Sequence, residues 1–325
     1  MTMIRRRAAL GLALAAPFIA RGASAQGEWP TRPIRLIIPF SAGGGGDSSA
    51  RPLAAKMSEI LGQNVIVENR TGGNAVVAAS AVLQAPRDGY TFLVDAANQI
   101  TNPLLLRDLP FDYGTSFLPV TQTARFPQVL AVRQDFPAQN IAEFIAHAKA
   151  NPGRVSCGTP PSAGAGHLAL ALLEQRAGIS LLHAPYRGGA DAARDIMGGQ
   201  IDSMILTSST ARAPIETGRA RPLALTCAER LPTLPNVPTL AESGFPGFDM
   251  DDWNGLFAPA GTPRAVIVRM QAAVSEAARD PGVLARMAPL GTVLGGQSTE
   301  VFAAWIGNQR EVVARVIREA KITLG

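Results

Sequence analysis

A run of four glycines followed by an aspartate is the first place in this sequence where residue types and spacing could do chemistry. Gly43 to Gly46 separate an apolar, β-branched segment at 34–38 from a helical pattern of apolar residues that follows Asp47. Glycines let the backbone approach a ligand closely, and the first N–H groups of a helix lack partners within it. The segment therefore predicts a small-anion site built from backbone donors.

Two nucleotide-binding loops also join a strand to a helix through glycines, and neither fits this segment. A Walker-type phosphate loop requires lysine and then serine or threonine after its last glycine, where this chain has Asp47. A dinucleotide loop requires a third glycine at a fixed offset, and none occurs there. Asp47 is expected to cap the helix and to pair with Arg51 four residues later. A plain glycine turn before a capped helix remains the alternative.

The elements that must position this loop alternate between strand and helix, which predicts an α/β protein. Strands are expected at 34–38, 64–70 and 90–94, with a small-residue helix at 75–83. Ligands of such sheets bind beyond the carboxyl ends of the strands. The loops after Ile38 and Val94 are therefore expected to form one wall of a site.

The same alternation restarts after residue 153. A strand at 154–157 leads into a second glycine-rich loop, 158–166, and then into a helix at 167–177. Two such loops, one in each α/β unit, could face each other across a cleft. Further strands are expected at 119–123, 129–132, 181–186, 200–206 and 222–226, further helices at 141–150, 189–197, 265–278 and 299–320, and a proline-rich loop at 231–250.

The first 25 residues have the three regions of an export signal. Three arginines at 5–7 precede the apolar run 8–20, and Ala23-Ser24-Ala25 fits a cleavage site. The apolar run is too short to span a bilayer comfortably, and the arginine cluster leaves the twin-arginine route open beside the general one. We expect a mature periplasmic chain from Gln26 onward. Its loss of four arginines removes most of the formal net charge of +5, so no basic surface remains to indicate nucleic acid.

Only two cysteines occur, Cys157 and Cys227. They could pair in an oxidising compartment, but two separate buried thiols are the expectation because nothing in the sequence fixes their distance. Neither lies at a spacing from His147, His167 or His183 that is typical of a metal site.

Short motifs spread over nearly the whole chain from Trp29 onward resemble one known family. Each motif is unspecific alone, but their order and spacing together are specific. The chain resembles the Bug-type periplasmic solute receptors, the substrate-binding proteins of tripartite tricarboxylate transporters. The matching segments are Trp29-Pro30-Thr31-Arg32-Pro33-Ile34, Pro39-Phe40-Ser41-Ala42-Gly43-Gly44, Val67-Glu68-Asn69-Arg70, Asp88-Gly89-Tyr90-Thr91, Asn102-Pro103, Pro185-Tyr186-Arg187-Gly188, Gly198-Gly199-Gln200-Ile201-Asp202, Asn236-Val237-Pro238-Thr239 and Ala258-Pro259-Ala260-Gly261-Thr262-Pro263.

This resemblance implies a two-lobed α/β receptor of the periplasmic-binding-protein type, in which each lobe is a mostly parallel sheet flanked by helices and the ligand binds between the lobes. Lobe 1 is expected to comprise 26–125 plus 250–325, and lobe 2 to comprise 126–249, with hinges near 125 and 250. The receptor is expected to be a monomer without enzymatic activity, cofactor or metal. Its expected partners are a small carboxylate (a dicarboxylate, an amino acid or an aromatic acid) and the permease subunits of a membrane transporter.

The family's ligand contacts can be carried over to matching positions of this chain. Family members hold a carboxylate through backbone N–H groups, hydroxyls and bridging water. The implied first-lobe contacts are Phe40, Ser41, Ala42, Gly43, Gly44 and Asn98, and the implied second-lobe contacts are Thr159, Ser162, Gly164, Ala165, His167 and Thr207.

Two other functional classes remain open at this point. The same receptor could deliver its closed form to a membrane signalling protein instead of a permease. An exported hydrolase would need a nucleophile, a base and an orienting acid, and the sequence contains no G-x-S-x-G nucleophile elbow. His147 is expected on a helix surface, and His183 in a strand as a core residue.

Overall fold

The computed structural model of the protein describes residues 29–43, 45–160, 163–186 and 188–323. The predicted export signal lies outside these ranges, as do Gly44 and Ser162. Among the described helices, none combines the length and the apolar character needed to cross a membrane.

The first of two sheets has six strands in the order β11-β4-β10-β3-β1-β2. Strands β2, β1 and β3 are parallel, whereas β10 and β11 pair antiparallel with their neighbours. The strands are β1 (Ile34–Ile38), β2 (Val65–Asn69), β3 (Thr91–Asp95), β4 (Phe117–Phe126), β10 (Asp252–Pro259) and β11 (Val293–Leu294). The helices around them are α1 (Gly45–Leu61), α2 (Val76–Leu83), α3 (Asn98–Leu105), α4 (Tyr113–Ser116), α9 (Arg264–Ala277), α10 (Pro281–Met287) and α11 (Thr299–Ala320), with short 3₁₀ turns at η1 (Gly73–Ala75) and η2 (Ala288–Leu290).

The second sheet has five strands in the order β7-β6-β8-β5-β9. Here β7, β6 and β8 are parallel, and β5 pairs antiparallel with β8 and β9. Its strands are β5 (Gln128–Arg133), β6 (Ser156–Thr159), β7 (Leu182–Pro185), β8 (Ser203–Thr207) and β9 (Ala220–Leu225). Its helices are α5 (Ile141–Ala150), α6 (Ala165–Ala177), α7 (Gly189–Met197) and α8 (Ser208–Glu216).

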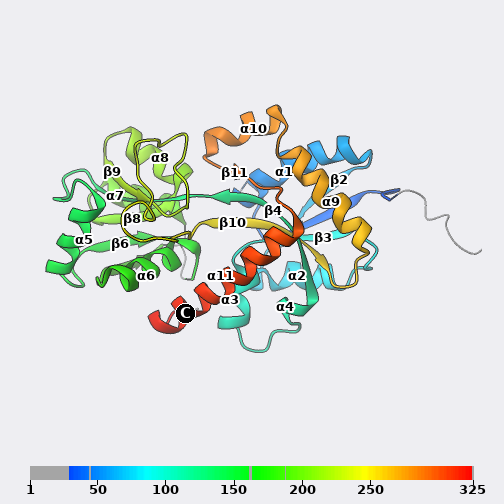
Figure 1. The fold of residues 1–325 in the computed structure, drawn as a ribbon, viewed down its shortest axis with the longest axis horizontal. Helices are drawn as coiled ribbons and strands as arrows, with labels where there is room; N and C mark the ends of the chain where they lie inside the picture. The colour runs from blue at the N-terminus through cyan, green and yellow to red at the C-terminus, as the bar shows by residue number, and fades with distance from the viewer. Residues whose placement is uncertain (1–28, 44, 161–162, 187, 324–325) are drawn as a thin grey trace, which may run out of the picture.

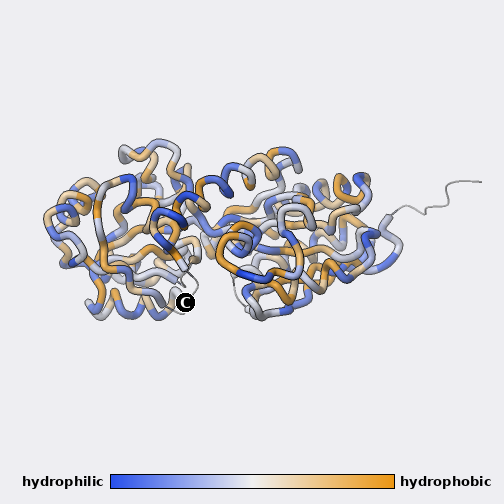
Figure 2. The backbone as a smooth tube through the Cα atoms, turned by 90° about the horizontal axis from the view of Figure 1, so that it is seen from below, coloured by the Kyte–Doolittle hydropathy of each residue, from blue (hydrophilic) through white to orange (hydrophobic). Residues whose placement is uncertain are grey.

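The two sheets form the two bodies that lie side by side in Figure 1 and, after a quarter turn, in Figure 2. The chain passes from the first sheet to the second at Pro127, between β4 and β5, and returns just before β10. Helix α11 packs against β4 of the first sheet and against α6 of the second. The predicted two-lobed α/β fold is confirmed. The prediction that each sheet is mostly parallel was wrong: both sheets are mixed, because the strands at the crossing pair antiparallel with their neighbours. The residue boundaries of the lobes stay a prediction.

The apolar alternation of β1 shows why this sheet is covered on both faces. Ile34, Leu36 and Ile38 pack into the cluster formed with α1 and α9, while Ile37 packs on the opposite face with α2. All four side chains are buried, and burying each contributes about 2 kcal/mol relative to exposure. The carboxyl end of β1 is thereby fixed where the first glycine loop begins.

Several elements were missed by the sequence patterns for identifiable reasons. Helices α3 and α8 contain prolines, Pro103 and Pro214, and proline inside a pattern normally argues against a helix. Strand β10 starts with Asp252 and includes Gly255, residues that are depleted in strands. It is nevertheless central in its sheet, between β3 and β4. The sequence patterns therefore predict no strand over 250–260, and the structure shows β10 there.

Candidate ligand-binding site

The first glycine loop is held by Asp47, the third residue of α1. Its Oδ2 accepts hydrogen bonds from the Gly43 N–H at 3.0 Å and from Arg51 Nε at 2.9 Å. Its Oδ1 accepts one from Asn69 Nδ2 at 2.8 Å, and the same Nδ2 also donates to the Phe40 carbonyl. The predicted Asp47–Arg51 pair is confirmed. Asp47 closes the loop by reaching back to Gly43, in the manner of a capping box.

These hydrogen bonds stabilise the ionised form of Asp47, and they engage one backbone N–H group of the loop. The Arg51 side chain, followed by the Gly43 N–H and Asn69, lowers the pKa of the buried Asp47 carboxyl to about 2 against the opposing effect of burial. Because Gly43 donates to Asp47, its N–H is already engaged. Ser41, Ala42 and Gly43 are themselves exposed.

The second glycine-rich loop is held by His167, the third residue of α6. Its Nδ1 accepts a hydrogen bond from the Ala163 N–H at 3.1 Å, which requires the neutral ring. The ring stacks on His183 with centroids 4.0 Å apart. His183 Nε2 lies 2.8 Å from Thr159 Oγ1, which is fully buried. Burial, and secondarily His183, lowers the pKa of His167 to about 4, and burial also lowers the pKa of His183.

A cavity of about 320 Å³ lies between the two lobes. It receives the N-terminal ends of three helices: α3 at Ala97 and Asn98, α6 at Gly164 to Gly166, and α8 at Thr207. Unpaired N–H groups and the helix dipole make such ends favourable for an anion. The lining comprises Phe40, Asn74, Ala96, Ala97, Asn98, Thr101, Asn102, Gln128, Pro160, Ala163, Gly164, Ala165, Gly166, Thr207 and Asp252.

This cavity brings together five of the residues singled out from the sequence: Phe40, Asn98, Gly164, Ala165 and Thr207. The cavity lining does not include Ser41, Ala42 or Gly43. It also does not include the buried Thr159 or the partly buried His167, whose contacts hold the second loop. Gly44 and Ser162 lie outside the described residues. That any of these positions contacts a ligand stays a prediction.

Two polar residues of the cavity were missed by the sequence reasoning. Gln128 begins β5 and is 2% exposed, and no partner for its Oε1 is found among the described residues. Asp252 begins β10 and is partly exposed where it lines the cavity, yet the protein packed around it raises its pKa to about 6. The acidic segment 249–252 was the available signal, because three aspartates beside a lobe crossing are unusual for a segment entering a sheet.

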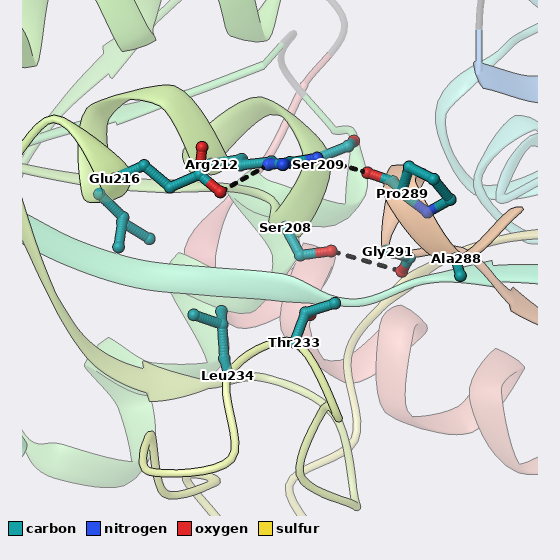
Figure 3. A pocket seen from close by; sticks show the side chains of 10 residues that line it. Ser208, Ser209, Arg212, Glu216, Thr233, Leu234, Ala288, Pro289 and Gly291 are labelled. Carbon is teal, nitrogen blue, oxygen red and sulfur yellow. Dashed lines mark hydrogen bonds and ion pairs between the residues drawn. The ribbon is translucent and has the colours of Figure 1, made fainter.

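A second cavity of about 400 Å³ lies between α8 and η2 (Figure 3). Arg212 Nη1 donates to the Pro289 carbonyl at 3.3 Å, and Ser208 Oγ donates to the Gly291 carbonyl at 3.4 Å. These bonds join helix α8 of the second sheet to the turn after α10. Although this cavity is larger, it receives fewer helix ends, and Arg212 is already paired with Glu216 at 2.7 Å. The smaller cavity is therefore the candidate ligand site.

The two cysteines do not form a disulfide in the described structure. Cys157 and Cys227 are free and buried, and burial raises the pKa of each thiol to about 12. No group of three metal-ligating side chains occurs within the residues that the structure describes. Ser48, in the first turn of α1, donates its hydroxyl to the Gly43 carbonyl.

Comparison with known proteins decides the family. Residues 49–321 match the model of the tripartite tricarboxylate transporter family receptor. The chain belongs to this family. A protein encoded in the tcbD–tcbE intergenic region of Pseudomonas sp. strain P51 is 38% identical, and the match covers 98% of this chain and 95% of that protein. The receptor is thus a Bug-type solute-binding protein and not an enzyme.

Solved structures of similar receptors carry ligands. Rpa4515 of R. palustris, described with adipate, is 33% identical with a TM-score of 0.75, and the match covers 91% of this chain and 99% of that one. MatC from Rhodopseudomonas palustris, described with bound malate, is 28% identical with a TM-score of 0.71, over 89% of this chain and 100% of that one. Both similar structures therefore contain small carboxylates.

Proposed function

We propose that this receptor binds a small carboxylate in the cavity between its two lobes and delivers it to the membrane subunits of a tripartite tricarboxylate-type transporter in the periplasm. The observation that carries the proposal is the convergence of the N-termini of α3, α6 and α8 on one cavity. Carboxylates in two similar receptors support it. The N-terminal pattern of charged, apolar and small residues supports export with cleavage near Ala25.

Binding would be coupled to closure of the lobes. One wall of the cavity belongs to the first sheet and its helices, through Phe40 and Asn98, and the other belongs to the second, through Gly164 and Thr207. A carboxylate that contacts both walls favours the closed form by its differential affinity. The proposed hinges lie at the two crossings, near 125 and 250.

Arg125 is placed to guide that motion. Its guanidinium pairs with Asp249 and with Asp251, the latter at 2.9 Å, and so ties β4 to the returning segment. Asp251 also accepts a hydrogen bond from Thr226 Oγ1. Both crossings are thus linked by one cation, and they would move together in a hinge motion.

Asn98→Asp tests the carboxylate site with little change in shape. Asn98 is the first residue of α3 and lines the cavity, where a negative charge suits the helix end but repels a bound anion. We expect the unliganded melting temperature to be kept and ligand-induced stabilisation by carboxylic acids to be lost. Asn98→Ala is the control, which removes the side chain without adding charge and should retain part of the stabilisation.

The ligand panel for this test pairs each acid with its neutral amide. A receptor for carboxylates shows a rise in melting temperature with an acid and none with its amide. Equal stabilisation of the wild type and Asn98→Asp by the same acid would contradict this site, and the absence of any shift across the panel would contradict carboxylate binding.

A further inference from the structure

The cavity contains acceptor atoms that the protein itself leaves without donors. Oε1 of Gln128 is buried and finds no partner among the described residues. One oxygen of Asp252 accepts the N–H of its own neighbour Trp253 at 2.9 Å, and no other hydrogen bond to this carboxyl is found in the described part of the chain. A buried polar atom without a partner is destabilising, so Gln128 Oε1 calls for a donor. The second oxygen of Asp252 is in a partly exposed residue that lines the cavity, and it is free to accept a hydrogen bond from a bound molecule.

Neighbouring acids show that this situation is specific to Asp252. Asp95, behind the cavity wall at the end of β3, accepts hydrogen bonds from the Ala96 N–H and from Gln99 Nε2 with its two oxygens. Asp251 is paired with Arg125 and bonded to Thr226. No arginine or lysine is among the described residues that line the cavity. Among the residues that the structure describes, Asp252 is thus the acid that lines the cavity without a paired cation.

The charge on Asp252 determines what can bind beside it. The pKa of about 6 leaves the carboxyl ionised at pH 7.5. Two like charges a few ångströms apart in a site screened from water repel each other strongly. A second ligand carboxylate near Asp252 is therefore disfavoured, whereas an ammonium group is attracted by a similar amount and can donate to Gln128 as well.

We propose that the ligand is an aminocarboxylate, held with its carboxylate toward the N-termini of α3, α6 and α8 and its ammonium group toward Asp252 and Gln128. This inference rests on the proposed function and narrows its ligand class. A hydroxyl group could satisfy Gln128, but it would leave the charge of Asp252 uncompensated. Asp252 is in this view the residue that determines specificity.

Isothermal titration of the mature protein at pH 7.5 tests this with ligands matched in length. One set is 6-aminohexanoate, hexanoate and adipate, and a second is glutamate and glutarate. The aminocarboxylate is expected to bind at least tenfold more tightly than its amine-free partners in one set or both, a difference of about 1.4 kcal/mol. Tightest binding by adipate or glutarate would overturn the inference and leave carboxylate binding intact. No binding by any acid would contradict the proposed function itself.

Asp252→Asn separates a charge effect from a packing effect, because asparagine keeps the shape and the oxygen that accepts the Trp253 N–H. The variant is expected to lose at least tenfold in aminocarboxylate affinity and to gain in dicarboxylate affinity. Asp108→Asn is the matched control, since it removes a carboxylate charge from an exposed position outside the cavity lining and should leave the preference unchanged. Gln128→Met should weaken aminocarboxylate binding by a smaller factor. An unchanged preference in Asp252→Asn, with the fold intact, would overturn the inference.

Discussion

The two strand–helix loops at the cavity share one geometry and differ in the chemistry that holds them. In each, a residue with positive φ donates its N–H to the third residue of the following helix: Gly43 (φ 78°) to Asp47, and Ala163 (φ 62°) to His167. Asp47 is charged and is balanced by Arg51. His167 is neutral and is held by stacking on its neighbouring imidazole.

That difference explains which loop is better suited to an anion. A carboxylate at the start of α1 already occupies the favourable position for negative charge. The neutral ring at the start of α6 leaves that helix end uncompensated, and Gly164, Ala165 and Gly166 all line the cavity. From the described part of the first loop, only Phe40 lines it. The second glycine-rich loop therefore contributes more of the cavity lining than the first, and its helix end is the more favourable one for an anion.

The largest expected loss of stability comes from removing the Asp47 carboxylate, which holds the first glycine loop. Asp47→Ala leaves the Gly43 N–H, Asn69 and Arg51 without their shared acceptor, so we expect a loss of about 3 kcal/mol in the free energy of unfolding. Urea denaturation measures it. Asp47→Asn retains one acceptor and should lose about half as much. A loss below about 1 kcal/mol in the alanine variant would mean that the loop is not held by this side chain.

His167, which holds the second glycine-rich loop as a neutral ring, should contribute less to stability. His167→Leu keeps an apolar group against His183 but cannot accept the Ala163 N–H, and an orphaned donor of this kind costs about 2 kcal/mol. The control is His167→Gln, whose side-chain oxygen can replace Nδ1. Equal stability of the leucine and glutamine variants in urea would show that the hydrogen bond contributes nothing beyond packing.

Lowering the pH should weaken the contributions of Asp47 and His167 to stability over different pH ranges. The folded pKa of His167, about 4, lies below its ordinary 6.5, so the unfolded chain binds more protons between these values and stability falls as pH drops through that range. His183 acts in the same direction. The folded pKa of Asp47 is lowered to about 2. Its contribution to stability is therefore kept until pH falls below about 4, and it is lost as pH drops further.

The difference in the free energy of unfolding between the wild type and His167→Gln isolates the contribution of His167. The titratable groups that both proteins share cancel in this difference. We expect the wild type to lose about 1 kcal/mol relative to this variant between pH 7.5 and 5.5. Urea midpoints at several pH values measure it. A pH-independent difference would show that folding leaves the pKa of His167 unchanged, and it would contradict a neutral ring that accepts the Ala163 N–H.

Much of this arrangement could be predicted from local sequence. Helices α5, α7 and α11 have the predicted bounds, because their apolar spacing and caps act within one element. The Asp47–Arg51 pair follows from helix periodicity in the same way. The family motifs placed both loops at one cleft, and three second-lobe positions predicted there, Gly164, Ala165 and Thr207, line the cavity.

The features that distinguish the two loops could not be predicted, because they depend on contacts between distant segments. The stacking of His167 on His183 joins α6 to β7 and requires the parallel register of β6 and β7. Asp252 enters the cavity only because β10 returns to the first sheet beside β4, with Asp252 opposite Phe126. No periodicity within either segment encodes these pairings. The acid that lines the cavity was therefore missed, although positions in both loops were predicted to belong to one site.

Exchanging the residues at positive φ gives the smallest expected effects and tests whether the two turns are equivalent. Gly43→Ala places a Cβ in open space, with no atom within 4 Å, but forces alanine into the left-handed region, at a cost of about 1 kcal/mol. Ala163→Gly relieves the same strain, yet it removes a buried methyl group worth about 0.8 kcal/mol, so its net change should stay within about 0.5 kcal/mol. Thermal unfolding of both variants measures these changes. A loss above about 2 kcal/mol in Ala163→Gly would mean that the methyl group, and not the His167 hydrogen bond alone, fixes the second glycine-rich loop.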